Sequence, residues 1–164
     1  MIKLQILKKK DIYKFYDLKK CLDNETNYML YSKNERTFDK NLLVEEINKE
    51  NCKGFILGAF DGNKMVGYID LEGSTLKKIS HIGCIVIGID KNYRRRGLGE
   101  KLLKKTIELA KYYDFKKIEL TVITNNTSAL NLYLKLGFEK EGIRKSSINI
   151  NGSLFDEYYM AKFI

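Results

Sequence analysis

The sequence contains no proline or tryptophan, one histidine and three cysteines among its 164 residues. His81 and the widely separated Cys21, Cys52 and Cys84 cannot supply the ligands of a zinc-type site, and no C-x-x-C pair is present. An odd number of distant cysteines also argues against a disulfide framework. We therefore expect no bound metal and reduced thiols.

Long apolar segments are also missing. No stretch approaches the roughly 18 apolar residues of a membrane-spanning helix. The apolar patch at the N-terminus is too short for a signal peptide and precedes its lysines instead of following them. We therefore expect a cytoplasmic protein without a membrane partner. A hydrophobic content of 44%, with 11 tyrosines and 8 phenylalanines, predicts one folded domain over residues 1–164.

Positive charge is in excess, with 30 lysines and arginines against 21 acidic residues and a formal net charge of +9. An excess of this size suggests an anionic partner. The lysines are, however, spread along the whole chain and form no stripe. A solvated basic surface therefore explains the charge better than nucleic-acid binding, which stays open as an alternative.

Hydrophobic periodicity predicts alternating strands and helices. The expected strands are Ile2–Ile6, 54–60, 64–71, 79–89, 117–122 and a closing pair within 138–163. The expected helices run from Asp11 to about Leu22, from Thr37 or Asp39 with Leu42, Leu43 and Ile47 buried, from Leu98 to about Ala110, and from Asn126 to a C-cap at Gly137. Asp61-Gly62-Asn63 and Asn151-Gly152 predict hairpin turns. This order is typical of a single α/β domain with a mixed sheet and about four flanking helices.

The stretch Ile85–Leu103, IVIGIDKNYRRRGLGEKLL, links a buried strand to a helix through a turn that contains glycine. The first N–H groups of such a helix have no partner and lie at the positive end of its dipole, so they can bind an anion. Gly97 and Gly99 would let a ligand approach the main chain closely. Leu102 stands where a dinucleotide fingerprint needs glycine or alanine, and no P-loop motif occurs. We therefore predict a diphosphate site here.

Two motifs together resemble the GNAT superfamily of N-acetyltransferases. Arg94-x-x-Gly97-x-Gly99 is similar to the acetyl-CoA-binding signature of that family. The second motif is Asn126-x-x-Ala129-x-x-Leu132-Tyr133-x-Lys135-x-Gly137-Phe138, which resembles the helix and strand that follow. The resemblance covers nearly the whole chain. It implies a GNAT-like domain with a mostly antiparallel mixed sheet, in which the parallel strands ending near Ile89 and Val122 splay apart.

The resemblance further implies acetyl-CoA as acetyl donor, with no metal. The pantetheine arm is expected in the gap between the splayed strands, and the diphosphate on the N–H groups from Arg95 to Glu100. The implied cofactor-binding residues are Ile87, Gly88, Ile89, Arg94, Arg95, Arg96, Gly97, Leu98, Gly99, Glu100, Asn126 and Tyr133. Asn126 could instead serve only as a helix N-cap, and at least one arginine could be merely solvent-exposed.

Acetyl transfer to an amine needs an acid for the leaving thiolate and a base for the amine proton. The resemblance implies Tyr133 as general acid, with a packed aromatic as the alternative. Many relatives carry a glutamate five residues before the asparagine, where this chain has Thr121. Glu119, on the same strand face, and His81 are the candidate bases.

Two further side chains complete the candidate site. Glu25 is a candidate contact for a cationic substrate. Cys84 could carry an acyl group as a nucleophile, but we expect its thiol to be buried in a strand.

We therefore expect transfer of an acetyl group from acetyl-CoA to a primary amine by direct attack in a ternary complex. The acceptor class stays open among small molecules, polyamines, antibiotics and peptide or protein N-termini. One alternative is an acyl-CoA-binding sensor without turnover, which the absence of a glutamate at Thr121 would permit. A homodimer and acyl groups other than acetyl also stay open.

Overall fold

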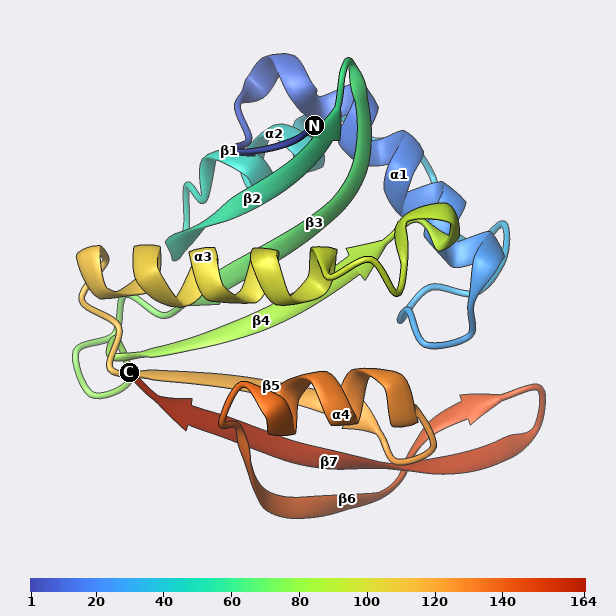
Figure 1. Ribbon diagram of the computed structural model, residues 1–164, viewed down its shortest axis with the longest axis vertical. Coiled ribbons are helices and arrows are strands. Elements are labelled where there is room, and N and C mark those ends of the chain that lie inside the picture. The colour runs from blue at the N-terminus through green and yellow to red at the C-terminus, as the bar shows by residue number, and fades with distance from the viewer.

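The computed structural model describes all residues 1–164 and contains a 7-stranded mixed sheet with the order β1-β2-β3-β4-β5-β7-β6 (Figure 1). The strands are β1 (Ile2–Ile6), β2 (Lys53–Asp61), β3 (Lys64–Gly73), β4 (Ile82–Ile89), β5 (Lys117–Ile123), β6 (Glu139–Ile150) and β7 (Ser153–Phe163). The helices are α1 (Ile12–Glu25), α2 (Lys40–Asn48), α3 (Leu98–Tyr112) and α4 (Thr127–Lys135), with short 3-10 turns at Lys9–Asp11 and Lys91–Tyr93. The predicted α/β fold with four helices is confirmed. No helix is long and apolar enough to cross a bilayer.

Three local predictions were wrong. β4 begins at Ile82 and not at Ile79, because Ile79 and Ile82 close successive turns by hydrogen bonds from their N–H groups to the carbonyls of Leu76 and Ile79. α1 continues past Leu22 to Glu25. Leu42 is 62% exposed, since only Leu43 and Ile47, four residues apart, lie on the buried face of α2.

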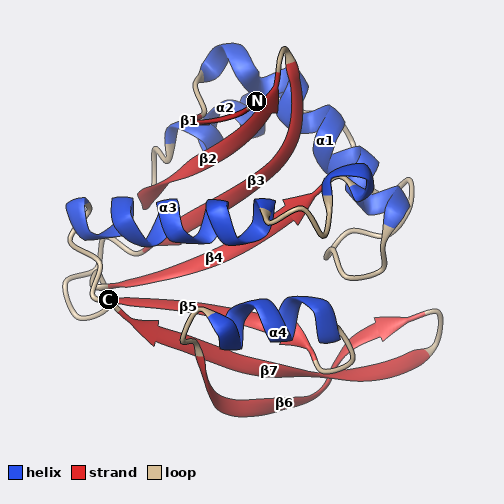
Figure 2. Cartoon of the chain, viewed as in Figure 1, coloured by secondary structure: helices blue, strands red, loops and turns tan.

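The helices form a layer on each face of the sheet (Figure 2). α3 and α4 cover one face over a core that includes Leu102, Leu103, Phe115, Ile118 and Phe138. α1 and α2 cover the other face over a second core that includes Phe15, Leu22, Ile56, Met65 and Tyr68. α1 and α2 pack on β2, β3 and β4, so they leave the same face of β5, β7 and β6 without a covering helix.

The parallel strands β4 and β5 pair only at their first residues. The register joins Ile82 to Lys117, Gly83 to Ile118 and Cys84 to Glu119, and pairing stops there. β4 remains paired with β3 as far as Ile89, and β5 remains paired with β7 as far as Ile123. The two strands therefore diverge toward their carboxyl ends, and the predicted splayed pair is confirmed (Figure 1).

Candidate functional site

The turn from β4 to α3 is anchored by a buried aspartate. Asp90 caps the short turn at Lys91–Tyr93 by accepting a hydrogen bond from the Asn92 N–H at 2.9 Å. The Asp90 carboxylate also pairs with Lys64 at 2.7 Å. Burial works to raise the pKa of Asp90, but Lys64 and the Asn92 N–H outweigh it and leave that pKa below its usual range. Asp90 therefore fixes the turn to the β2–β3 hairpin as an ionised group.

A run of unpaired main-chain donors follows. None of the N–H groups from Arg95 to Glu100 donates to a protein acceptor. Gly97, the N-cap of α3, has a left-handed φ of 75° and provides no side-chain cap. These N–H groups lie at the positive end of the α3 dipole, where an anion is stabilised. The geometry is that of an anion site built from backbone.

Gly99 is required by close packing at this site. A Cβ atom on Gly99 would lie 2.9 Å from Leu132 Cδ2 and 3.3 Å from Ile89 Cδ1. The absence of a side chain therefore lets the first turn of α3 approach both α4 and the end of β4. This contact brings the two sequence motifs together in space.

The three arginines of the turn have different surroundings. The Arg94 Nε donates to the Ile89 carbonyl at 2.7 Å, and its Nη2 donates to Glu25 at 3.1 Å. Arg95 is exposed with a left-handed φ of 59°, and Arg96 is exposed with its guanidinium 5.6 Å from the centre of the Tyr93 ring. Only Arg95 and Arg96 therefore have side chains that no carboxylate engages.

The edge of β4 that faces the gap carries the main chain expected to bind pantetheine. Ile87, Gly88 and Ile89 lie beyond the last pairing with β5. A Cβ atom on Gly88 would lie 2.4 Å from Leu22 Cδ1 and 2.9 Å from Tyr68 Cε1, so this glycine also lets α1 pack on the sheet. The Ile89 carbonyl already accepts the Arg94 hydrogen bond.

Tyr133 lies on α4, which packs beside the gap, and Asn126 is the N-cap residue of that helix (Figure 1). Tyr133 is buried in the core under α3 and α4, with its ring 5.8 Å from that of Phe138, and its hydroxyl has no protein hydrogen-bond partner. Burial raises the pKa of Tyr133 well above its ordinary value, so the phenol stays protonated. The Asn126 Oδ1 accepts from the Ala129 N–H at 3.3 Å and therefore does cap α4.

Glu119 and Thr121 lie on the sheet face that no helix covers. The Glu119 carboxylate accepts from Lys117 Nζ at 2.7 Å, and Lys117 also binds Glu141. Cys84 is the register partner of Glu119 and is exposed, so the expectation of a buried thiol was wrong. It is exposed because α1 and α2 end short of this part of the sheet. Although Cys84 is exposed, partial desolvation of its sulfur on the sheet surface, together with Glu119 and Glu72, raises its pKa, which disfavours a nucleophilic thiolate.

His81 and Glu25 lie away from that face. His81 is exposed just before β4, at the end where β4 and β5 are still paired, and its carbonyl accepts from the Lys116 and Lys117 N–H groups. Glu25 ends α1, and both its carboxylate oxygens accept hydrogen bonds within the protein, from Cys21, Lys91 and Arg94. The structure therefore does not bring either residue to Tyr133.

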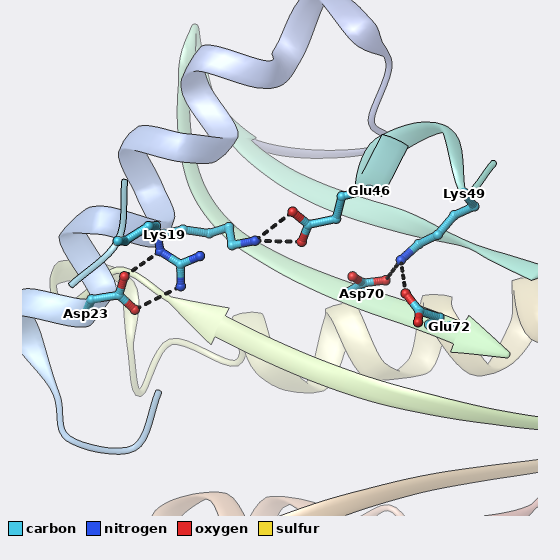
Figure 3. A network of polar contacts seen from close by, with 7 residues as sticks. Lys19, Asp23, Glu46, Lys49, Asp70 and Glu72 are labelled. Carbon is cyan, nitrogen blue, oxygen red and sulfur yellow. Dashed lines mark hydrogen bonds and ion pairs between the residues drawn. The ribbon is translucent and has the colours of Figure 1, made fainter. Parts of the chain in front are cut away.

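A charged network beneath α1 and α2 was missed in the sequence (Figure 3). Lys49, at the end of α2, contacts Asp70 at 2.5 Å and Glu72 at 3.0 Å. Lys19 pairs with Glu46 at 2.6 Å, and Asp23 holds Arg36 through two hydrogen bonds. The one available signal was Asp70, an isolated carboxylate in the apolar run MVGYIDL.

Burial controls the charges of this network. It raises the pKa of Asp70 to about 6, and Lys49 offsets only part of that effect. Burial also lowers the pKa of Lys19, despite the Glu46 carboxylate. No group of three or more His, Cys, Asp or Glu side chains is placed to hold a metal ion.

Comparison with known proteins gives consistent matches. The "Acetyltransferase (GNAT) family" matches residues 14–138. The L-amino acid N-acetyltransferase AaaT of Escherichia coli is 32% identical over 108 residues, which are 65% of this chain and 66% of that protein. The chain thus spans about two thirds of the length of this curated relative.

Solved structures match over the full length. A GNAT-family acetyltransferase from Streptococcus pneumoniae has a TM-score of 0.92 and 28% identity, covering 100% of both chains. YncA of Salmonella typhimurium, solved with its cofactor acetyl-CoA, has a TM-score of 0.85 at 17% identity, covering 99% of this chain and 94% of that one. At that identity the second match establishes the fold alone.

Proposed function

Because the chain belongs to the GNAT family and is therefore an acetyltransferase, we propose that it transfers an acetyl group from acetyl-CoA to a primary amine by direct attack in a ternary complex. The observation that carries this proposal is the run of unpaired N–H groups from Arg95 to Glu100, placed beside the gap between β4 and β5. A hydrogen bond to a charged group contributes about 1.5–3 kcal/mol, so a few of these donors suffice to hold a diphosphate.

The gap between β4 and β5 can hold the pantetheine arm of acetyl-CoA. With the diphosphate on the turn, the pantetheine arm extends along the unpaired edge of β4 toward Cys84 and Glu119, where β4 and β5 meet. The thioester then reaches the sheet between α4 on one face and the uncovered face on the other. The acceptor amine enters from the uncovered face, since α3 and α4 occupy the opposite side.

The chemistry requires two proton transfers. The neutral amine attacks the thioester carbonyl carbon, a C–N bond forms, the C–S bond breaks and the thiolate leaves. An amine with a pKa of about 10.4 is almost wholly protonated at pH 7, so a base must take its proton. Tyr133 donates a proton to the thiolate. Its buried and protonated phenol, which has no protein hydrogen-bond partner, supports this role.

Glu119 is the base in this scheme, acting through water. It lies on the uncovered face at the last pairing between β4 and β5, where the amine would enter. His81 is less suited, because it precedes β4 at the end where β4 and β5 are paired, about 10 Å before Cys84 at roughly 3.3 Å per residue. Lys117 holds the Glu119 carboxylate in place.

An acetyl-transfer screen tests the proposal. Thiol release from acetyl-CoA is followed over L-amino acids, polyamines, aminoglycosides and peptides, starting with L-amino acids because of the name of the E. coli relative. Turnover of at least one amine is the expected result. Calorimetric binding of acetyl-CoA without turnover on any acceptor would instead identify an acyl-CoA sensor, and the absence of binding would refute the proposed donor.

A further inference from the structure

Glu25, the last residue of α1, is a point of contact between α1 and the cofactor turn. Its side chain is only 8% exposed, and its Oε2 accepts from the Lys91 N–H at 3.0 Å and from Arg94 Nη2 at 3.1 Å. The Cys21 thiol donates to the other oxygen at 3.2 Å. A carboxylate this well covered and this fully bonded is held in one position.

Arg94 connects the fixed Glu25 carboxylate to β4. Its Nε donates to the carbonyl of Ile89, the last residue of the strand, at 2.7 Å. The same guanidinium thus joins the end of α1 to the end of β4, in front of the unpaired donors that begin at Arg95. Moving Arg94 onto a diphosphate would leave the Ile89 carbonyl unpaired and deprive the covered Glu25 carboxylate of its charged partner, which is unfavourable.

The neighbouring arginines need no such movement. Arg95 and Arg96 are exposed and engage no carboxylate, so either side chain can reach an anion without breaking an ion pair. The turn therefore already has two free cations next to its N–H groups.

Glu25 also starts the segment that leads to α2. Asp23, in the same last turn of α1, holds Arg36 near the other end of that segment, with Oδ1 3.1 Å from the Arg36 Nη2. The last turn of α1 is thus tied to the cofactor turn by Glu25 and to residues 26–36 by Asp23.

We infer that Glu25 and Arg94 are a positioning pair: they hold the carboxyl end of β4 and the turn in the geometry that accepts the donor, and Arg94 acts through the Ile89 main chain and not as a diphosphate ligand. This inference rests on the proposed use of acetyl-CoA. It assigns to Arg94 a different role from the charge contact that the sequence motif predicts.

The test compares two donors, acetyl-CoA and acetyl-pantetheine, which lacks the diphosphate and nucleotide. If Arg94 positions the β4 edge, Arg94→Met should lower kcat/KM by about tenfold for both donors, as expected for the loss of roughly 1.4 kcal/mol. The matched control is Arg96→Ala, which should lower kcat/KM for acetyl-CoA only. Loss with acetyl-CoA alone in Arg94→Met would overturn the inference, because it is the signature of a diphosphate ligand.

Glu25→Gln tests the other half of the pair. It should lower kcat/KM with both donors, and combining it with Arg94→Met should cost no more than Arg94→Met alone, because the two side chains act as one unit. Independent, additive losses would refute a shared role. Circular dichroism and melting curves check that each variant is folded.

Hydrogen exchange separates this inference from the proposed function. Glu25→Gln should speed amide exchange in residues 89–94, where the Lys91 N–H bonds the carboxylate, and in residues 26–36 that follow α1. This measurement needs no donor and no turnover. If the wild-type protein neither binds nor uses acetyl-CoA, the proposed function is refuted. If amide exchange in Glu25→Gln equals that of the wild type, the inference of a positioning pair is refuted.

Discussion

The donor turn, which is the segment from β4 to α3 with the unpaired N–H groups, and the α1–α2 side of the sheet are both polar. They are assembled in opposite ways. The donor turn is one continuous stretch in which the backbone N–H groups of consecutive residues, Arg95 to Glu100, have no protein acceptor. The α1–α2 side gathers charged side chains from α1, the segment before α2, α2 itself and β3, and neutralises them in pairs (Figure 3).

This difference shows what each region can recognise. Main-chain donors at a helix start favour any anion of suitable shape, and their geometry depends on local glycines. Charged side chains that already contact a partner offer little charge to a ligand until that partner is displaced, so they mainly fix where α1 and α2 lie. The donor turn therefore favours one class of ligand, whereas the paired side chains determine where α1 and α2 lie.

The largest effect is expected at Tyr133 on α4, the helix that packs against the first turn of α3 through Leu132 and Gly99. Tyr133→Phe removes the proton donor but keeps the ring, so kcat should fall by about 10³-fold, within the range for general acid catalysis. The dissociation constant of acetyl-CoA, measured by calorimetry, should stay within about twofold. Equal kcat in the variant would show that Tyr133 only packs in the core.

On the α1–α2 side the largest effect should be on stability. Arg36→Met leaves the Asp23 carboxylate, only 2% exposed, without its partner. We expect the free energy of unfolding to fall by about 3 kcal/mol, which corresponds to a melting temperature lower by roughly 6–12 °C. Lys105→Met is the matched control, because the Lys105–Glu108 pair is exposed and should contribute under about 0.5 kcal/mol. If both variants lost similar amounts of unfolding free energy, burial of the Arg36–Asp23 pair would not explain its contribution to stability.

A smaller effect is expected from backbone strain at the donor turn. Gly97→Val forces a β-branched residue into φ 75°, at a cost of about 1–2 kcal/mol, so acetyl-CoA affinity should drop by roughly 5–30-fold if the turn relaxes to relieve it. Gly62→Val is the control, since Gly62 has φ 57° and also has no neighbour near its Cβ position. That variant should lose stability and keep its affinity; an equal loss of affinity in both would contradict a local site.

The smallest effect is a pH dependence on the α1–α2 side. Because burial raises the pKa of Asp70 to about 6, the folded protein binds the Asp70 proton more tightly than the unfolded chain. This contribution to stability is complete below the unfolded value of about 3.9 and is lost as pH rises through about 6. Denaturant unfolding between pH 4.5 and 7.5 should therefore show wild type losing stability relative to Asp70→Asn. Parallel pH profiles would mean that Asp70 titrates normally.

Patterns within about 20 residues of one another were sufficient to predict the order of elements, the hairpin turns and the strand-to-helix turn between β4 and α3. Alternation in β5 predicted that Ile118, Leu120 and Val122 share one face of the sheet, and all three are buried. Each of these predictions depends on backbone geometry, which the local sequence largely sets.

The side-chain partners came only from the tertiary structure. Arg94 and Glu25 are 69 residues apart, and no local pattern shows that Arg94 bonds a carboxylate and a strand carbonyl before any phosphate. Likewise Cys84 is exposed only because α1 and α2 stop short of β5, and Asp70 meets Lys49 only because α2 ends above β3. The physical reason is range: main-chain hydrogen bonding is decided by neighbouring residues, whereas charge pairing and exposure depend on which distant elements the fold brings together.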